Sequence, residues 1–316
     1  MDNLTHSLVG AVLAQLGLKK RTGLAVPTLI IAANLPDIDA ACAVYGIESL
    51  SMRRGITHGP IALVLLPIAL WALMIAFDRW QDRRGKRPAG RLPIDRGWLL
   101  ALAYIGCFSH PALDWLNNYG IRLLEPFSHR WFYGDTLFII DLWIWIALGL
   151  SVWLSLRRER RGTANWRRPA WIGFSAVCAY IFANGLITGR AEAQATELLR
   201  KAGQDGALVV ASPPPLAFWR RDIAWRRDGY YGGGAYVLGS GSTVEPGIPD
   251  GMSDLRLRVW VKNDPAALAF LFWSRMPVAE TEGSAIVLHD QRYMQPVARD
   301  RFTVRVEDPR TATIVE

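Results

Sequence analysis

Histidine and aspartate side chains lie near the ends of apolar stretches in the first 130 residues of this 316-residue chain. His110 and Asp114 are four residues apart, so on a helix both side chains lie on one face and can reach a common ion. Neutral imidazole nitrogens and carboxylate oxygens are ligands that zinc and similar divalent ions accept. The sequence therefore predicts a site for one to three divalent ions, with zinc as the expected metal. The candidate ligands are His6, Asp37, Asp39, His58, His110 and Asp114.

Taken singly, these residues have simpler interpretations. A lone histidine at a helix end often makes only a structural hydrogen bond, and an Asp-x-Asp pair such as Asp37 and Asp39 often marks only the end of a helix. The set is more informative, because residues that are distant in sequence fall on one predicted face of the protein. Other catalytic templates are absent from the sequence, which has no His-Glu-x-x-His motif, no phosphate-binding P-loop and no Gly-x-Ser-x-Gly elbow.

The composition points to a membrane protein. Hydrophobic residues make up 51% of the chain and charged residues only 20%, which excludes a disordered chain and disfavours an ordinary soluble one. A net charge of +8 could indicate a nucleic-acid partner, but the whole excess lies in residues 1–189, together with the apolar runs. We therefore expect membrane lipids, and no nucleic acid, as partners. The three cysteines are scattered in apolar surroundings and are expected to be buried hydrophobic residues.

Residues 1–189 are predicted to form a mostly α-helical, polytopic membrane bundle with about four to six membrane segments. Residues 59–77 and 169–189 carry no charge and each meets the length of about 20 residues that a membrane-spanning helix needs. The two shortest segments could instead be buried or re-entrant helices. The expected segments are 4–18, 22–36, 59–77, 97–113, 136–156 and 169–189.

The distribution of basic residues predicts the orientation of these segments. Most cations of residues 1–189 fall in three short loops, at 19–21, 79–96 and 157–168, which the positive-inside rule assigns to the cytoplasm. The histidines and aspartates then lie on the opposite side of a bacterial inner (plasma) membrane, together with residues 190–316. We expect those residues to form a small soluble, extracytoplasmic α+β domain, with a short helix at 191–202. Strict alternation predicts strands at 255–262 and 302–307.

Short motifs in residues 1–150 resemble those of the LexA-regulated (YdjM-like) membrane-bound metal-dependent hydrolases. The resemblance implies a polytopic membrane protein with a metal-dependent hydrolase site, and the layout is also similar to that of zinc-dependent phospholipase C. The matching motifs are Asp2-Asn-Leu-Thr-His6, Leu35-Pro-Asp-Ile-Asp39, Arg54-Gly-Ile-Thr-His58, His110-Pro-Ala-Leu-Asp114, Asn118-Tyr-Gly120, Pro126-Phe-Ser128 and Ile140-Asp141.

One position departs from the family pattern, which has a histidine where this chain has Arg53. If that histidine is a ligand, one metal ion is weakened, absent or replaced here by the guanidinium. Arg54 matches the family arginine and is the expected phosphate clamp, since guanidinium binds phosphate bidentately. Alternatively, both arginines extend towards lipid headgroups.

The leading hypothesis is an integral-membrane hydrolase that acts on a phosphoester or lipid-linked substrate through a metal-activated water. Asp114 or Asp39 would be the general base, and Arg54 would stabilise anionic charge. The alternative is a non-enzymatic membrane protein, either a metal-binding transporter or a lipid-binding factor in envelope stress. A transporter should carry polar groups deep in several spans, whereas 59–77 and 169–189 are apolar throughout. The sequence leaves the substrate and the oligomeric state open.

Overall fold

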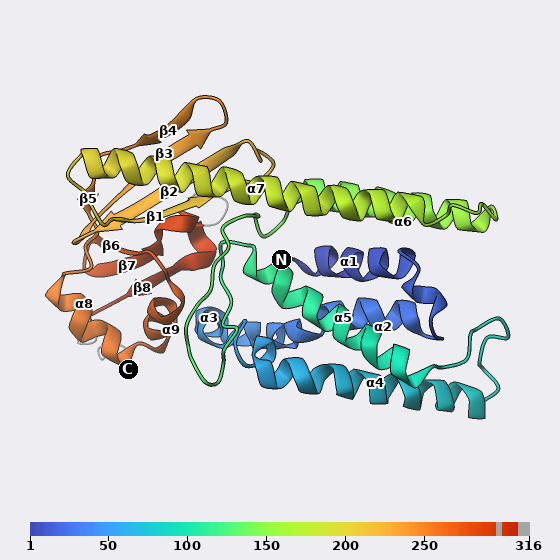
Figure 1. Ribbon diagram of the computed structural model, residues 1–316. Coiled ribbons are helices and arrows are strands. Elements are labelled where there is room, and N and C mark those ends of the chain that lie inside the picture. Colours follow the sequence, from blue (N-terminus) through green and yellow to red (C-terminus); the bar gives the residue numbers. More distant parts are fainter. Residues whose placement is uncertain (295–298, 309–316) are drawn as a thin grey trace. The chain divides into compact units, whose positions relative to one another are not determined.

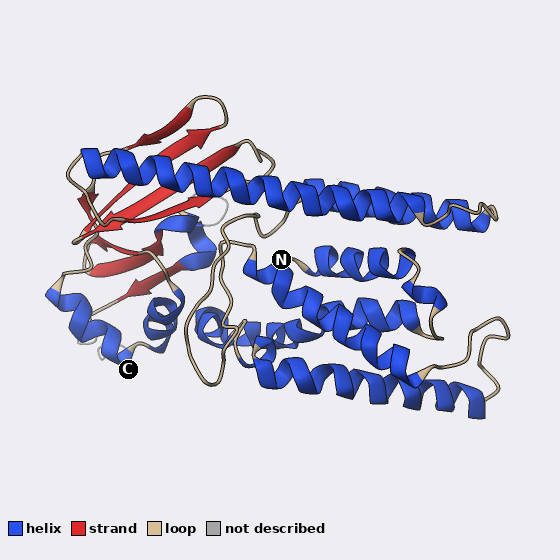
Figure 2. Ribbon diagram, in the orientation of Figure 1, coloured by secondary structure: helices blue, strands red, loops and turns tan. Residues whose placement is uncertain are grey.

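The computed structural model describes residues 1–294 and 299–308 and divides into two compact units. The first unit contains Met1–Asp39 and Arg54–Leu186, and the second contains Ala40–Arg53 and Ile187–Glu316. Helices make up the first unit, whereas the second combines two antiparallel sheets with short helices (Figures 1 and 2). An N-terminal helical region is thus followed by a small sheet-rich domain, in agreement with the predicted fold class.

The helices of the first unit run back and forth between two ends. Helix α1 leads away from the end that holds His6, α2 returns to it, α4 leads away again and α5 returns (Figure 1). The elements of this unit are α1 (Asn3–Gln15), η1 (Leu18–Lys20), α2 (Ala25–Asn34), the first residues of η2 (Leu35–Glu48), η3 (Ile56–His58), α4 (Pro60–Arg83), α5 (Arg96–Trp115), α6 (Leu142–Arg160) and most of α7 (Arg168–Lys201).

Three of the described helical stretches are long and apolar enough to cross a membrane: Ala25–Met52, Pro60–Arg83 and Arg168–Lys201. The predicted number of four to six segments is therefore not confirmed. Helix α6 is apolar for most of its length, but its last turn carries Arg157, Arg158 and Arg160. Helix α5 has His110 and Asp114 among its last residues, which lowers its apolar character at that end.

Two glycines allow the helices around α2 to approach closely. A Cβ on Gly10 of α1 would lie 2.8 Å from the carbonyl oxygen of Leu29, and one on Gly106 of α5 would lie 2.9 Å from the same oxygen. Any larger residue would push α1 and α5 away from α2. Because His6 and His110 are each one helical turn from these glycines, this contact sets the distance between the two imidazoles.

The second unit contains two antiparallel sheets. In the first sheet the strands follow the order β1-β2-β3-β4, with β5 beside β3, and in the other sheet the order is β6-β7-β8. Helix α3 (Ser49–Met52) belongs to this unit and packs against α9 (Pro265–Trp273). The strands are β1 (Leu208–Ser212), β2 (Arg220–Arg227), β3 (Tyr230–Val237), β4 (Gly241–Val244), β5 (Ile248–Pro249), β6 (Pro277–Glu282), β7 (Ala285–Asp290) and β8 (Thr303–Val306).

Two predictions for this part of the chain are wrong in detail, whereas the strand expected at 302–307 is found as β8. The short helix expected at 191–202 is the end of α7, since the residues after Gly189 are good helix formers and nothing breaks the helix. The segment expected as a strand at 255–262 forms α8 (Leu255–Trp260) and η4 (Val261–Asn263). The buried residues of α8, Leu257 and Trp260, are three apart, which is a helical spacing.

The start of α8 explains why the alternating pattern was misleading. The side chain of Asp254 accepts a hydrogen bond from the backbone N–H of Arg256 at 2.8 Å and so caps the helix. Leu255 and Val259, which the alternation assigned to a buried face, are 74% and 60% exposed. The capping residue was thus a better guide to this segment than hydrophobic periodicity.

Candidate metal site

Four side chains meet at one end of the helical unit and could hold a metal ion. One ligand atom from each of them lies within 4.8 Å of the ligand atoms of the other three, and all four residues are buried. They come from three separate places: the residues after α2, the end of η3 and the last turns of α5. We call this group the four-residue cluster; its members are Asp37, His58, His110 and Asp114.

The distances within the four-residue cluster suit a small divalent ion. Nε2 of His110 lies 3.6 Å from Oδ1 of Asp37 and 3.4 Å from Oδ2 of Asp114. Nε2 of His58 lies 3.9 Å from Oδ1 of Asp37 and 3.6 Å from Oδ2 of Asp114. A tetrahedral zinc site with bonds of about 2.1 Å has ligand–ligand distances of about 3.4 Å. The four atoms are therefore spaced like the corners of such a site.

Hydrogen bonds on the far sides of the two imidazoles orient their inner nitrogens. Nδ1 of His110 lies 2.7 Å from the carbonyl oxygen of Ala33, which can only accept a hydrogen bond, so this nitrogen carries the proton. In the neutral ring Nε2 then presents a lone pair to the cluster. The helix α2 that ends beside Ala33 thus fixes both the position and the tautomer of His110.

Asp39 and Thr57 together orient His58. Its Oδ2 accepts hydrogen bonds from the Thr57 hydroxyl at 2.9 Å and from the backbone N–H of Arg54 at 2.7 Å, and it lies 3.4 Å from Nδ1 of His58. The Thr57 oxygen is itself 2.9 Å from Nδ1, so this nitrogen is the donor and Nε2 faces the cluster unprotonated. Burial lowers the pKa of His58 to about 4, which keeps the ring neutral at pH 7.

A buried atom without a hydrogen bond shows that the cluster fits a cation. Oδ1 of Asp37 is buried and, within residues 1–294 and 299–308, receives no hydrogen bond. Two Nε2 lone pairs, those of His58 and His110, face each other across 3.1 Å, which is unfavourable unless a proton or a cation lies beside them. A divalent metal ion would satisfy all three atoms at once.

Arg54 holds Asp114 in place. Its guanidinium contacts both carboxylate oxygens, with Nε 3.1 Å from Oδ2 and Nη2 3.2 Å from Oδ1. It also donates to Oδ1 of Asn117 at 3.0 Å and lies over the ring of Tyr119, 4.6 Å from its centroid. The amino group of Met1 forms a further ion pair with Oδ1 of Asp114. The predicted phosphate clamp is therefore already engaged with a carboxylate.

His6 lies beside the four-residue cluster without belonging to it. Its ring stacks on that of His110, with centroids 3.8 Å apart and planes at 19°, and its Nε2 lies 3.4 Å from Oδ1 of Asp114. Among the described residues neither ring nitrogen of His6 has a hydrogen-bond partner. His6 therefore contacts one of the four residues directly. Its role as a metal ligand stays a prediction.

The match to known proteins covers this whole site. A family comparison matches residues 1–191 to the YdjM inner membrane protein family. The chain belongs to the YdjM family. No curated protein and no solved structure gives a match. The YdjM region contains all six predicted ligands and the four-residue cluster, and it ends shortly after the part of α7 that lies in the first unit.

Other residues of the matching motifs have structural contacts. Asp2 caps α1, since its Oδ1 accepts from the backbone N–H groups of Leu4 and Thr5 at 3.0 Å. Asp141 caps α6 and accepts a hydrogen bond from the Tyr180 hydroxyl at 2.9 Å. Arg53 follows α3 and is assigned to the other unit, so the consequence of this arginine for metal binding stays a prediction.

Sequence reasoning overlooked three contributors to the site. Thr57 precedes His58 in the Arg54-Gly-Ile-Thr-His58 motif, and a hydroxyl beside a candidate ligand is a usable signal for an orienting group. Asn117 lies three residues after Asp114, a spacing that brings side chains near each other on a helix. The carbonyl of Ala33 carried no signal, because it depends on how α2 packs beside α5.

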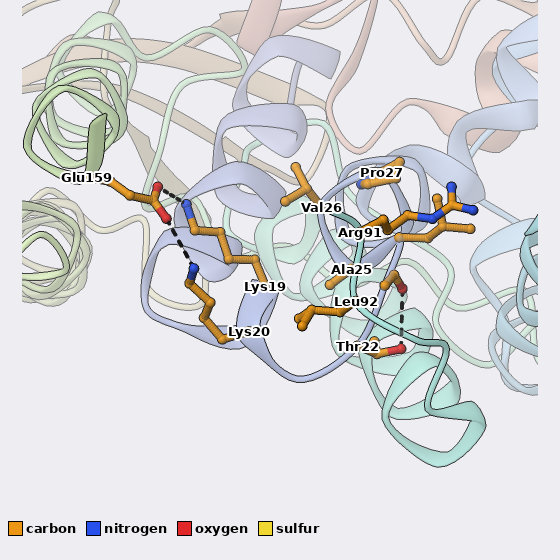
Figure 3. Close-up of a pocket in the computed structure, with 11 residues that line it drawn as sticks. Lys19, Lys20, Thr22, Ala25, Val26, Pro27, Arg91, Leu92 and Glu159 are labelled. Carbon is orange, nitrogen blue, oxygen red and sulfur yellow. Dashed lines mark hydrogen bonds and ion pairs between the residues drawn. The ribbon is translucent and has the colours of Figure 1, made fainter. Parts of the chain in front are cut away.

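A pocket of the YdjM region, about 350 Å³ in volume, lies at the basic end of the helices, opposite to the four-residue cluster. Lys19 and Lys20 line it, and both form ion pairs with Glu159 (Figure 3). Arg91 also lines it and pairs with Asp78. Because these cations already have carboxylate partners, this pocket is a weaker candidate for function than the buried cluster.

Proposed function

We propose that this YdjM family member is an integral-membrane, metal-dependent hydrolase that acts on a phosphoester or lipid-linked substrate. The observation that carries the proposal is the spacing of the four-residue cluster, with two Nε2 atoms and two carboxylate oxygens at distances suited to one zinc-sized ion. When bound, such an ion would supply a water of lowered pKa and polarise a phosphoryl oxygen.

In this proposal the chain's own residues have distinct tasks. Asp37, His58, His110 and Asp114 hold the ion, and Asp39 orients His58 through its outer nitrogen. Of the two aspartates considered as general base, Asp114 contacts the Arg54 guanidinium through both oxygens, whereas Oδ1 of Asp39 has neither an ion pair nor a hydrogen bond to any described residue. Asp39 is therefore the better candidate to accept a proton, and Arg54 stabilises the anionic charge around Asp114.

The charges around the cluster favour a single ion over two or three. Asp37, Asp39 and Asp114 supply three negative charges, but Asp114 already contacts a cationic group, the Arg54 guanidinium. A second or third divalent ion would add positive charge to a buried site without additional carboxylates to offset it. We propose one divalent ion per chain, with zinc as the first metal to test.

The proposal places the cluster on the extracytoplasmic side of the inner membrane. The YdjM family match and three apolar helical stretches support a membrane protein. The basic residues of 19–21, 79–96 and 157–168 lie at the end of the helical unit opposite to the cluster, as the positive-inside rule requires if that end is cytoplasmic. Residues 190–316 then follow on the extracytoplasmic side.

A transporter fits the same observations less well. Its ligands should lie partway along several spans, with a polar route to both sides. Here the ligands share one end of the unit, and α4 carries no charged residue between Pro60 and Phe77. The cluster is therefore placed for chemistry at one membrane surface.

Hydrolysis by the purified protein tests the proposal. Phosphomonoester, phosphodiester and phospholipid substrates would be offered to detergent-solubilised protein with and without added zinc. We expect release of phosphate or headgroup that falls by at least about 10²-fold in Asp39→Asn, because a general base contributes about 10²–10⁴-fold. His289→Gln, whose residue lies in β7 outside the site, should retain activity. Metal-loaded protein without activity on any of these substrates would contradict the hydrolase assignment.

A further inference from the structure

A groove of about 600 Å³ runs between α6 and α7 in the helical unit, away from the metal site. Most of its lining is apolar, and two arginines lie at one end, Arg158 near the end of α6 and Arg168 at the start of α7. The remaining lining residues are Ala147, Leu150, Ser151, Leu154, Pro169, Ile172, Gly173 and Ala176.

The two helices keep a fixed spacing along this groove. A Cβ on Gly173 would lie 2.4 Å from Cβ of Ser151 and 3.2 Å from the carbonyl oxygen of Ala147, so the backbones touch at this point. The side chains beside the contact point outward: Leu150 is 53% exposed and Ile172 is 59% exposed. The close contact at Gly173 thus fixes the shape of the groove between α6 and α7. Its exposed apolar surface is poorly hydrated by water.

Among the described residues, the arginines at its end have no carboxylate partner. In the part of the chain that the structure describes, the guanidinium groups of Arg158 and Arg168 make neither a hydrogen bond nor an ion pair, and both residues are exposed. This distinguishes them from Lys19, Lys20 and Arg91 in the other basic pocket, each of which has a carboxylate partner. Two guanidinium groups that line the same groove and have no described partner provide a site for a phosphate, which they can bind through several N–H donors.

The chemistry of the groove specifies one kind of ligand. From Arg158 back to Ala147 is about 16 Å along the helix, at about 1.5 Å per residue, and apart from Ser151 the α6 residues that line this length are apolar up to the charged end. A ligand that fills it needs an extended apolar chain and an anionic head. Helix α7 is also one of the stretches suited to span a membrane, so lipid is the medium that its exposed apolar side meets.

We propose that the α6–α7 groove binds an anionic phospholipid, with an acyl chain along the apolar lining and the phosphate between Arg158 and Arg168. The site is separate from the metal cluster and does not depend on hydrolase activity. It anchors the loop between α6 and α7 to the headgroup layer of the leaflet on the basic side of the protein.

Native mass spectrometry of the detergent-purified full chain tests this proposal, with phosphatidylglycerol and phosphatidylcholine as the two probes. The wild type should retain phosphatidylglycerol in preference to phosphatidylcholine. Arg158→Gln combined with Arg168→Gln should weaken phosphatidylglycerol binding by about tenfold or more, the scale of one lost charged hydrogen bond. The double variant Arg79→Gln and Arg83→Gln is the matched control, because it removes two basic residues without described side-chain partners from the end of α4 and should bind as the wild type does.

A second variant fills the groove without changing charge. Ala176→Phe keeps both arginines and should also reduce phosphatidylglycerol binding, while thermal unfolding without added lipid reports whether each variant is folded. Inorganic phosphate in excess should not displace the lipid, since it lacks the acyl chain. Binding unaffected in both groove variants, equal retention of the two lipids, or displacement by phosphate alone would overturn the proposal. A change in subunit number in Ala176→Phe would instead assign the groove to a protein–protein contact and would equally overturn it.

Discussion

Nε2 of His58 and Nε2 of His110 face each other across 3.1 Å in the interior of the helical unit. Each ring donates its other nitrogen's hydrogen to a fixed acceptor, Thr57 for His58 and the carbonyl of Ala33 for His110. Two such lone pairs would repel each other in the absence of a cation, so this relationship is the strongest structural argument for a metal ion.

The first prediction concerns the glycine that brings α5 against α2. In Gly106→Ala the new Cβ would lie 2.7 Å from Cβ of Ala32 and 2.9 Å from the carbonyl oxygen of Leu29, so the helices must separate. We expect a loss of stability of about 1–3 kcal/mol, typical of overpacking, together with weaker metal binding. Thermal unfolding in detergent measures the effect.

Gly149→Ala in α6 is the control for this variant, because a Cβ there meets nothing within 4 Å. It should be neutral or stabilise the protein by up to about 1 kcal/mol, as expected for alanine in place of glycine in a helix. Equal stability of the two variants would contradict the close packing that positions His110.

The second prediction concerns Asp39, whose Oδ2 lies 3.4 Å from Nδ1 of His58. Asp39→Asn should leave a bound ion but lower its affinity by about 10–100-fold, the effect usual for a group that orients a histidine ligand. Competition with a chromophoric chelator measures the affinity. Asp141→Asn, which changes the cap of α6, should bind as the wild type does. Complete loss of stoichiometric metal in Asp39→Asn would instead make Asp39 a direct ligand.

The third prediction concerns pH. Burial lowers the pKa of His58 to about 4 in the folded protein, whereas the unfolded chain titrates near about 6.5. The unfolded state therefore binds more protons between these values, and stability should fall as the pH drops from about 6.5 towards 4. His58→Gln removes the titrating ring. It should therefore reduce the slope of the free energy of unfolding against pH by up to about 1.4 kcal/mol per pH unit. Denaturation of the metal-free proteins at several pH values measures both slopes. Equal slopes in the wild type and in His58→Gln would contradict the burial of His58.

The fourth prediction concerns orientation. In a background without Cys42, Cys107 and Cys178, single cysteines at Arg87→Cys and Ser240→Cys should react with membrane-impermeant reagents from opposite sides of the membrane. Labelling in intact cells, spheroplasts and inverted vesicles separates the two sides. Reaction of both positions from the same side would refute the proposed topology and the extracytoplasmic location of residues 190–316.

Much of the site could be predicted from sequence because its residues sit at helix ends. The i, i+4 spacing of His110 and Asp114 and the location of Asp37 after an apolar run are local features, and antiparallel helices bring such ends together. Which of these residues bind the ion and which orient the histidines could not be predicted in this way. Whether Asp39 points to the inner or the outer nitrogen of His58 depends on the backbone between Arg54 and His58, where Arg54 adopts a positive φ of 52°.

The fold could be predicted where a long uncharged run determines a helix, and less well in short segments. The predicted segment 59–77 coincides, except for its first residue, with the first part of α4, one of the stretches suited to span a membrane, as its uncharged composition indicates. The prediction of a strand at 255–262 was wrong because alternation of apolar and charged residues is also compatible with a short capped helix in which Leu257 and Trp260 are buried. The close contacts of Gly10 and Gly106 depend on three helices at once and leave no periodic signal in the sequence.

Metal analysis of the purified protein tests the central claim most directly. Inductively coupled plasma mass spectrometry of the wild type should find about one divalent ion per chain, and His289→Gln should match it. His110→Ala and the double variant His110→Ala with Asp114→Ala should each lose the bound ion while remaining in the detergent-soluble fraction. Full metal occupancy in the variant that lacks both His110 and Asp114 would contradict the account.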